Sequence, residues 1–246
     1  MHTEQHMQQV MRVARATLVA MLLMVGVAAH ADETANHVTD QELSDAKCAI
    51  GMEKFLPGDY YYCLGAQNYG TQHTEAAQRF FKEAAGWASK PAQYVLGIMA
   101  LNGDHEPMDR PLAYAWFTLA AERQTPRFVQ PRDALKATLS ADELRRAEAY
   151  LTDMRRTYAD AVAAPRAETR YHDGMAALKS SGGNSYCMAG SQDFRDLAEG
   201  KAPTSCPPTN TVVQFIDKQA NNVFEDWTGH VTVGAIEAAS PASATQ

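Results

Sequence analysis

The chain has 246 residues, a hydrophobic share of 46% and a formal net charge of −7 at pH 7. This length and composition suit one or two modest globular domains with a buried core. The acidic excess argues against nucleic acid, and against an anionic membrane surface, as the default partner.

The N-terminal segment has the pattern of an export signal. Two arginines are the only arginines or lysines before an apolar run from Ala16 to Ala29. That run is too short to span a bilayer, which takes about 20 apolar residues. It has the length of a signal-peptide core, and Ala29-His30-Ala31 supplies a small-x-small cleavage pattern. We therefore expect a signal peptide over residues 1–31 and a periplasmic or secreted protein, with no membrane insertion after signal cleavage.

A capping box opens the first helix expected after the signal peptide. Thr39-x-x-Glu42 has the spacing in which the two side chains satisfy each other's backbone N–H groups. The apolar residues that follow favour a helix running to about Phe55. We interpret it as the N-terminal cap of the folded domain.

All four cysteines lie in the expected mature chain, at Cys48, Cys63, Cys187 and Cys206. An even number in an oxidising compartment predicts two disulfides, for which three pairings are possible. We favour the sequence-local pairing, Cys48–Cys63 and Cys187–Cys206. The first pair flanks a Pro57-Gly58 turn, and opposite positions on two antiparallel helices can come within bridging distance. Zinc ligation is the alternative, but the spacings fit no zinc module, so neither metal nor cofactor is expected.

Two stretches share one helix–loop–helix pattern, a Tyr-x-Leu-Gly start and an Ala-x-x-aromatic-aromatic-x-x-Ala-Ala finish. The starts at Tyr62 and Tyr94 are 32 positions apart, whereas the finishes at Ala77 and Ala113 are 36 positions apart. The four extra positions in the second stretch fall between the halves, where they predict a longer loop. Periodic repetition of this kind indicates stacked helix pairs, so the predicted fold class is all-α.

These residues resemble the Sel-one-like repeat family, which is related to the tetratricopeptide repeats. The second unit, from Pro91 to Glu122, matches the family pattern at Ala92, Tyr94, Leu96, Gly97, Gly103, Asp109, Ala113, Trp116, Phe117, Ala120 and Ala121. The first unit, from Asp59 to Ala85, is degenerate and lacks four loop residues. The resemblance implies a short α/α solenoid, of an exported bacterial type, that serves protein–protein recognition.

A second capping box, Ser140-x-x-Glu143, predicts the helix that closes this solenoid near Pro165. The expected repeat domain therefore covers residues 32–164. Beyond it, residues 165–237 belong to no family that we can name. Helical spacing continues through Ala167, Tyr171, Met175 and Leu178, and again from Val212 to Trp227.

Between and after these C-terminal helices we expect less regular structure. A loop stapled by Cys187 and Cys206 separates the two helical stretches. Alternating residues at 230–233 are compatible with a short strand. The tail over residues 238–246 is rich in Ala, Ser, Pro and Thr and is expected to be disordered.

The function class that this pattern favours is binding of a protein or peptide partner in the cell envelope. In stacked helix pairs the first helices line a concave face, and their positions outside the core are free to contact a ligand. Tyr61 is equivalent to Gln93 and Gln67 to Met99, so these four side chains are the candidate binding residues. The alternative is recognition through the loop from Cys187 to Cys206.

The rival class is an envelope enzyme acting on peptidoglycan or a β-lactam. Ser44-x-x-Lys47 has the spacing of the serine nucleophile and lysine base in penicillin-recognising enzymes. The S-D-N element and the α/β domain of those enzymes are missing, so we expect a solvated helix face and no enzyme. The loop from Asp104 to Asp109 carries side chains able to bind metal, but Asp109 is better explained as a helix N-cap.

Overall fold

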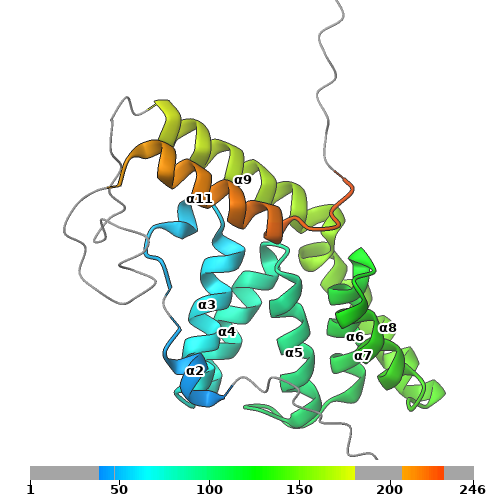
Figure 1. The fold of residues 1–246 in the computed structure, drawn as a ribbon. Coiled ribbons are helices and arrows are strands. Elements are labelled where there is room, and N and C mark those ends of the chain that lie inside the picture. Colours follow the sequence, from blue (N-terminus) through cyan, green and yellow to red (C-terminus); the bar gives the residue numbers. More distant parts are fainter. Residues whose placement is uncertain (1–38, 47, 181–206, 230–246) are drawn as a thin grey trace, which may run out of the picture. The chain divides into compact units, whose positions relative to one another are not determined.

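The computed structural model describes residues 39–46, 48–180 and 207–229 (Figure 1). The elements in chain order are α2 (Asp40–Ser44), η1 (Met52–Lys54), α3 (Pro57–Gly70), α4 (Thr74–Gly86), α5 (Lys90–Asn102), α6 (Arg110–Ala120), η2 (Ala121–Arg123), α7 (Pro126–Lys136), α8 (Ala141–Tyr158), α9 (Asp160–Ser180) and α11 (Thr209–Val223). Within these ranges there is no β-strand, which confirms the predicted all-α class. No helix there has the length and hydropathy needed to cross a membrane.

Several expectations concern residues outside the described ranges. They are the signal peptide over 1–31, the stapled loop between Cys187 and Cys206, the strand at 230–233 and the tail over 238–246.

The two sequence repeats form two helix hairpins. Helix α3 packs against α4, and α5 packs against α6. Three residues (71–73) connect the first pair and seven (103–109) connect the second. The predicted four-residue difference in loop length is therefore confirmed, and it lies between the two helices of the second unit.

Equivalent glycines let the two helices of each hairpin approach closely. A Cβ atom added at Gly65 would lie 2.5 Å from the ring of Phe81, and one added at Gly97 would lie 2.4 Å from the ring of Phe117. The tyrosine three residues before each glycine packs on the same phenylalanine, with ring centroids 5.7 Å and 5.4 Å apart. The two hairpins thus share their packing as well as their sequence pattern.

Capping residues fix where α5 and α6 begin and where α5 ends. Ser89 accepts a hydrogen bond from the N–H of Ala92, and Asp109 accepts one from the N–H of Leu112, 3.0 Å away. These bonds satisfy backbone donors that a helix start leaves free. Gly103 ends α5 in the left-handed region, at φ 80°, where glycine carries no Cβ penalty. The predicted N-cap role of Asp109 is confirmed.

The first predicted helix is shorter than expected. The capping box of Thr39 and Glu42 is present, but α2 ends at Ser44 and does not reach Phe55. Gly51 takes a left-handed conformation, at φ 98°, immediately before the 3-10 turn η1. A residue in this conformation cannot continue a right-handed helix, so the segment turns instead of running straight.

The disulfide between Cys48 and Cys63 is present, with the two Cα atoms 5.6 Å apart. The predicted placement of the two cysteines on antiparallel helices is wrong. Pro57 is the first residue of α3 and not part of a turn between two helices. The bond instead ties the irregular segment before η1 to the second turn of α3.

The region after the repeats departs from the predicted single closing helix. Helix α8 begins with the expected capping box at Ser140 but ends at Tyr158. After the extended residue Ala159, α9 begins at Asp160 and continues through Pro165 to Ser180. The predicted helix end near Pro165 is wrong, and the boundary expected between residues 164 and 165 falls inside α9. Helix α7 was not predicted.

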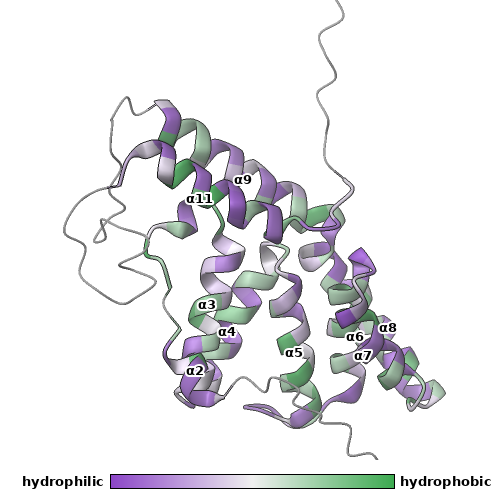
Figure 2. Ribbon diagram, viewed as in Figure 1, coloured by the Kyte–Doolittle hydropathy of each residue, from purple (hydrophilic) through white to green (hydrophobic). Residues whose placement is uncertain are grey.

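The C-terminal helices share a core with the segment that precedes the repeats. Figure 1 shows α9 and α11 side by side, and both carry hydrophilic and hydrophobic residues along their length (Figure 2). The cluster comprises Met52, Phe55, Leu56, Met175, Leu178, Val212, Ile216 and Ala220. The predicted apolar stripes of both helices are confirmed. Through them, α9 and α11 pack against the segment around η1.

Candidate functional site

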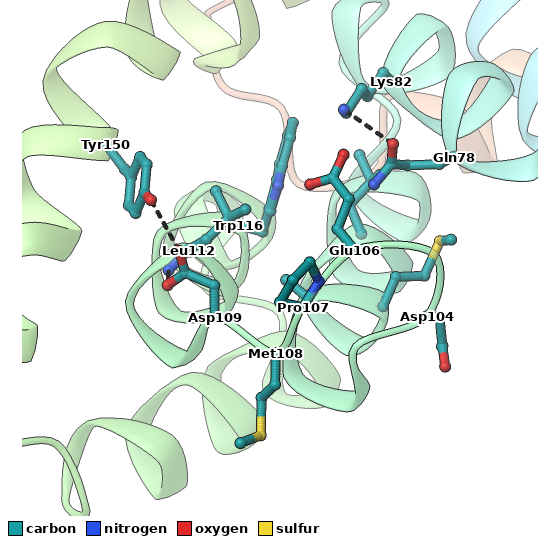
Figure 3. Close-up of a pocket in the computed structure, with 13 residues that line it drawn as sticks. Gln78, Lys82, Asp104, Glu106, Pro107, Met108, Asp109, Leu112, Trp116 and Tyr150 are labelled. Atoms are coloured by element: carbon teal, nitrogen blue, oxygen red, sulfur yellow. Dashed lines mark hydrogen bonds between the residues drawn. The ribbon is translucent and has the colours of Figure 1, made fainter. Parts of the chain in front are cut away.

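The long connection of the second hairpin forms one wall of a pocket of about 550 Å³. Helix α4 supplies Gln78 and Lys82, and α8 supplies Tyr150 (Figure 3). The floor comes from α5 and α6, with Met99 and Trp116 among its residues. We call this hollow the loop pocket, because the connection over residues 103–109 exists in this length only in the second repeat.

The floor of the loop pocket is apolar and its rim exposes large hydrophobic side chains. Leu96, Met99 and Trp116 are 2%, 2% and 4% exposed. On the rim, Met108 is 64% exposed and Tyr150 is 38% exposed. They are two of the four large hydrophobic residues exposed in the described part of the chain. Apolar surface gathered around a hollow is typical of a binding site, whereas single exposed residues are common.

Two phenol–carboxylate hydrogen bonds hold the loop in place. Tyr150 donates to Asp109 Oδ2 and Tyr69 donates to Asp104 Oδ2, each over 2.8 Å. The bond to Asp109 raises the pKa of Tyr150, and burial followed by the bond to Asp104 raises the pKa of Tyr69 to about 12. Both phenols therefore remain protonated donors at neutral pH and keep their hydrogen bonds to the loop.

Lys82 is the one cation among the described lining residues of the loop pocket, and Glu106 is a third carboxylate beside Asp104 and Asp109. Lys82 Nζ donates to Gln78 Oε1 over 3.1 Å. The Glu106 side chain reaches in from the loop, between Trp116 and Gln78 (Figure 3). Neither charge forms an ion pair with another residue in the described ranges. The pocket thus has more negative than positive charge beside its apolar floor, and the Lys82 and Glu106 side chains are available to a ligand.

The four candidate binding residues from the sequence do not form one exposed surface. Gln93 is 0% exposed and Met99 is 2% exposed, so their predicted accessibility is wrong. Tyr61 and Gln67 are half-buried. Tyr61 stacks on Phe80, with ring centroids 6.4 Å apart. Met99 is the only one of the four that lines the loop pocket, while a binding role for Tyr61 and Gln67 stays a prediction.

Gln93 is buried, and its side chain contacts the end of α8. Its Nε2 donates to the carbonyl of Tyr158 over 2.8 Å, and its Oε1 accepts from Lys90 Nζ over 3.1 Å. The Gln93 amide therefore supplies a hydrogen-bond donor to a backbone carbonyl in the last turn of α8, where the chain passes into α9. A polar group removed from water needs such partners, and Gln93 is a structural residue.

A buried ionic network surrounds that junction. Lys90 Nζ lies 2.6 Å from Glu122 and 3.1 Å from Asp160. Arg123 Nε lies 2.8 Å from the second oxygen of Asp160, and its Nη1 donates to the carbonyl of Val223 over 2.7 Å. The network links the start of α5, the 3-10 turn η2, the start of α9 and the end of α11. With two cations and two carboxylates it is internally neutralised.

The catalytic pair of the rival hypothesis is only partly described. Ser44 is the last residue of α2, and its hydroxyl donates to the carbonyl of Gln41 over 2.8 Å. Lys47 lies outside the described residues. The geometry of the pair is therefore not tested, and the enzyme hypothesis stays a hypothesis.

The loop pocket does not follow from the sequence pattern alone, although one feature pointed to it. The four extra residues of the second repeat create the wall that carries Glu106 and Met108. The carboxylates and the histidine of this loop favour a metal site as the first interpretation, whereas the loop also carries the apolar Met108. An exposed apolar side chain in a lengthened loop, here Met108, indicates a binding surface.

Comparison with known proteins gives limited information. No family model and no curated protein matches the chain. Among solved structures, it is similar to a protective antigen present in uropathogenic Escherichia coli strains, described as displaying an SLR fold, with 20% sequence identity and a TM-score of 0.35. The match covers 47% of this chain and 27% of that chain. A likeness of this size does not place the chain in a family.

Proposed function

We propose that this chain is an exported protein of the Sel-one-like repeat type that binds an extended peptide segment of a protein partner in the loop pocket. The observation that carries the proposal is the hollow of about 550 Å³ whose loop wall is held by two phenol–carboxylate hydrogen bonds. It combines a buried apolar floor with the exposed Met108 and Tyr150 and with the Lys82 and Glu106 side chains, which form no ion pair with a described residue. Apolar anchoring with a few placed polar groups is typical of peptide sites.

The assignment to the repeat type is supported by the shared pattern and packing of the two hairpins. Gly65 against Phe81 repeats as Gly97 against Phe117. The longer loop occurs in the unit that also has the fuller match to the family pattern. Proteins of this type are expected to present loops and grooves to other proteins.

Export is supported by the basic-then-apolar N-terminus and by the disulfide between Cys48 and Cys63, since stable disulfides form in oxidising compartments. We expect the mature protein to begin at Asp32, and we expect Cys187 and Cys206 to be bonded to each other. Intact mass and thiol titration of material from the cell envelope measure both. A retained N-terminus contradicts the cleavage, and two free thiols in the denatured, unreduced protein contradict the second disulfide.

The peptide-binding proposal is tested by selecting displayed random peptides on the mature protein and measuring their affinity by fluorescence anisotropy. Met108→Ala is expected to weaken binding about tenfold, because it removes an apolar contact made only in the complex. The melting temperature should not change, since the side chain is 64% exposed.

The matched control is Val162→Ala, which truncates another exposed hydrophobic side chain, 42% exposed, on α9. It should leave the affinity unchanged. Equal affinities for wild type and the Met108 variant, or an equal loss in both variants, would contradict binding in the loop pocket.

A further inference from the structure

A second hollow adjoins the loop pocket and has the opposite electrostatic character. It has a volume of about 440 Å³, and six of its lining residues are Arg79, Lys82, Glu83, Trp87, Tyr158 and Arg166. We call it the basic pocket. Lys82 lines both hollows, and Trp116 of the loop pocket packs on Tyr158 of the basic pocket, with ring centroids 4.9 Å apart. A single ligand can therefore reach both.

The basic pocket concentrates positive charge on an acidic protein. It holds three cations and one carboxylate, whereas the chain carries a net charge of −7. Arg79, Lys82 and Arg166 form no ion pair with any residue of the described ranges. Glu83, one turn after Arg79, instead accepts a hydrogen bond from Trp87 Nε1 over 3.3 Å. The charge of the pocket is thus left for an external anion.

Arg166 is held in position by contacts that do not neutralise it. Its Nη2 donates to the carbonyl of Gly86 and, over 3.3 Å, to that of Thr157. The guanidinium also lies over the Trp87 ring, 5.4 Å from the centroid. A guanidinium has five N–H donors in a planar fork that matches a carboxylate. The remaining donors of Arg166 are therefore preorganised for such a group.

Arg79 and Lys82 extend from the same face of α4, three positions apart. Like charges at this spacing repel each other, and an anion placed between them and Arg166 relieves that repulsion. Trp87 and Tyr158 supply flat apolar surface beside the charges. A ligand that carries both oxygen acceptors and apolar groups fits these cations and aromatic rings better than a small hydrated anion does.

We infer that the basic pocket binds a carboxylate of an acidic peptide segment, from either an acidic side chain or a free C-terminus. The inference rests on the proposed function, because it assigns the loop pocket to an apolar side chain of the same segment. Lys82, shared by the two hollows, lies where the two parts of the segment meet.

The test uses probes without apolar side chains, so that it reads the basic pocket alone. Acetyl-tetraglutamate amide carries side-chain carboxylates, acetyl-tetraglutamine with a free C-terminus carries one terminal carboxylate, and acetyl-tetraglutamine amide carries none. Each is titrated into the mature protein while the Trp87 indole N–H and the arginine Nε–H signals are followed by ¹H–¹⁵N NMR. We expect at least one carboxylate probe to shift the Trp87 and Arg166 signals, with an affinity that falls as salt rises. The neutral probe should shift neither.

The deciding variant is Arg79→Gln/Lys82→Gln, which should weaken carboxylate binding about tenfold or more. Its matched control is Lys136→Gln/Arg145→Gln, which removes the same charge from exposed positions outside both pockets and should bind as wild type does. If the double variant melts early, Arg79→Gln alone serves, because that side chain is exposed and has no hydrogen-bond partner in the described ranges. No shift with either carboxylate probe, equal losses in both double variants, or tighter binding of inorganic phosphate would each overturn the inference.

The peptide-binding proposal and the carboxylate site can be rejected independently of each other. Met108→Ala should leave tetraglutamate affinity unchanged, because Met108 does not line the basic pocket. Carboxylate binding without any selected peptide would reject the peptide-binding proposal alone. Selected peptides that depend on Met108 but ignore Arg79 and Lys82 would reject the carboxylate site alone.

Discussion

Asp160→Asn is expected to lower the free energy of unfolding by about 3–5 kcal/mol, the cost of leaving a buried charge without its partner. The carboxylate lies 2.8 Å from Arg123 Nε and 3.1 Å from Lys90 Nζ. The side chains of Arg123 and Lys90 are 5% and 4% exposed. Lys90 keeps Glu122, but Arg123 loses its carboxylate and cannot shed its proton. Urea denaturation followed by circular dichroism measures the change.

The control for this variant is Asp142→Asn. Asp142 pairs with Arg145 on the surface, where both side chains are more than two-thirds exposed. Surface pairs contribute about 0–1 kcal/mol, so the control should unfold almost as wild type does. A cost at Asp160 no larger than at Asp142 would mean that the network does not hold α9 and α11 against the repeats.

Trp116→Ala is expected to cost about 3–5 kcal/mol, as for other buried aromatic side chains. Trp116 is 4% exposed and packs against Tyr158, so its loss leaves a cavity between α6 and α8. Ser44→Ala is the comparison, since it removes one hydrogen bond to the Gln41 carbonyl, worth about 1 kcal/mol. Thermal and urea unfolding of both variants measure the difference. A Trp116 variant as stable as the Ser44 variant would contradict the packing of the second hairpin.

The helix hairpins could be predicted because their information is local. Apolar spacing indicates the buried face of each helix, and the carboxylate of Asp109 marks a helix start because it can cap the first turn. The glycines at 65 and 97 indicate close helix approach, and each indeed lies against a phenylalanine of the partner helix. Local pairing also sufficed for the disulfide between Cys48 and Cys63.

The predictions that were wrong concern residues whose environment is set by distant parts of the chain. Gln93 follows the spacing of an exposed face, but the carbonyl of Tyr158, 65 positions later, covers it. No residue near Lys90 in the sequence indicates that its side chain will pair with Asp160. The helix end predicted near Pro165 was wrong because α9 contains this proline, just as α7 contains Pro131. A proline costs a helix one hydrogen bond, and packing against the rest of the domain can outweigh that cost.

Amide hydrogen exchange of the mature protein with a selected peptide bound tests the central claim most directly. We expect slower exchange in residues 96–112, which include the long loop, and at residues 78–82 of α4, with α11 unchanged. That footprint would place the peptide in the loop pocket. Protection confined to residues 181–223, with the loop exchanging as in the free protein, would contradict the account and move recognition to the C-terminal region.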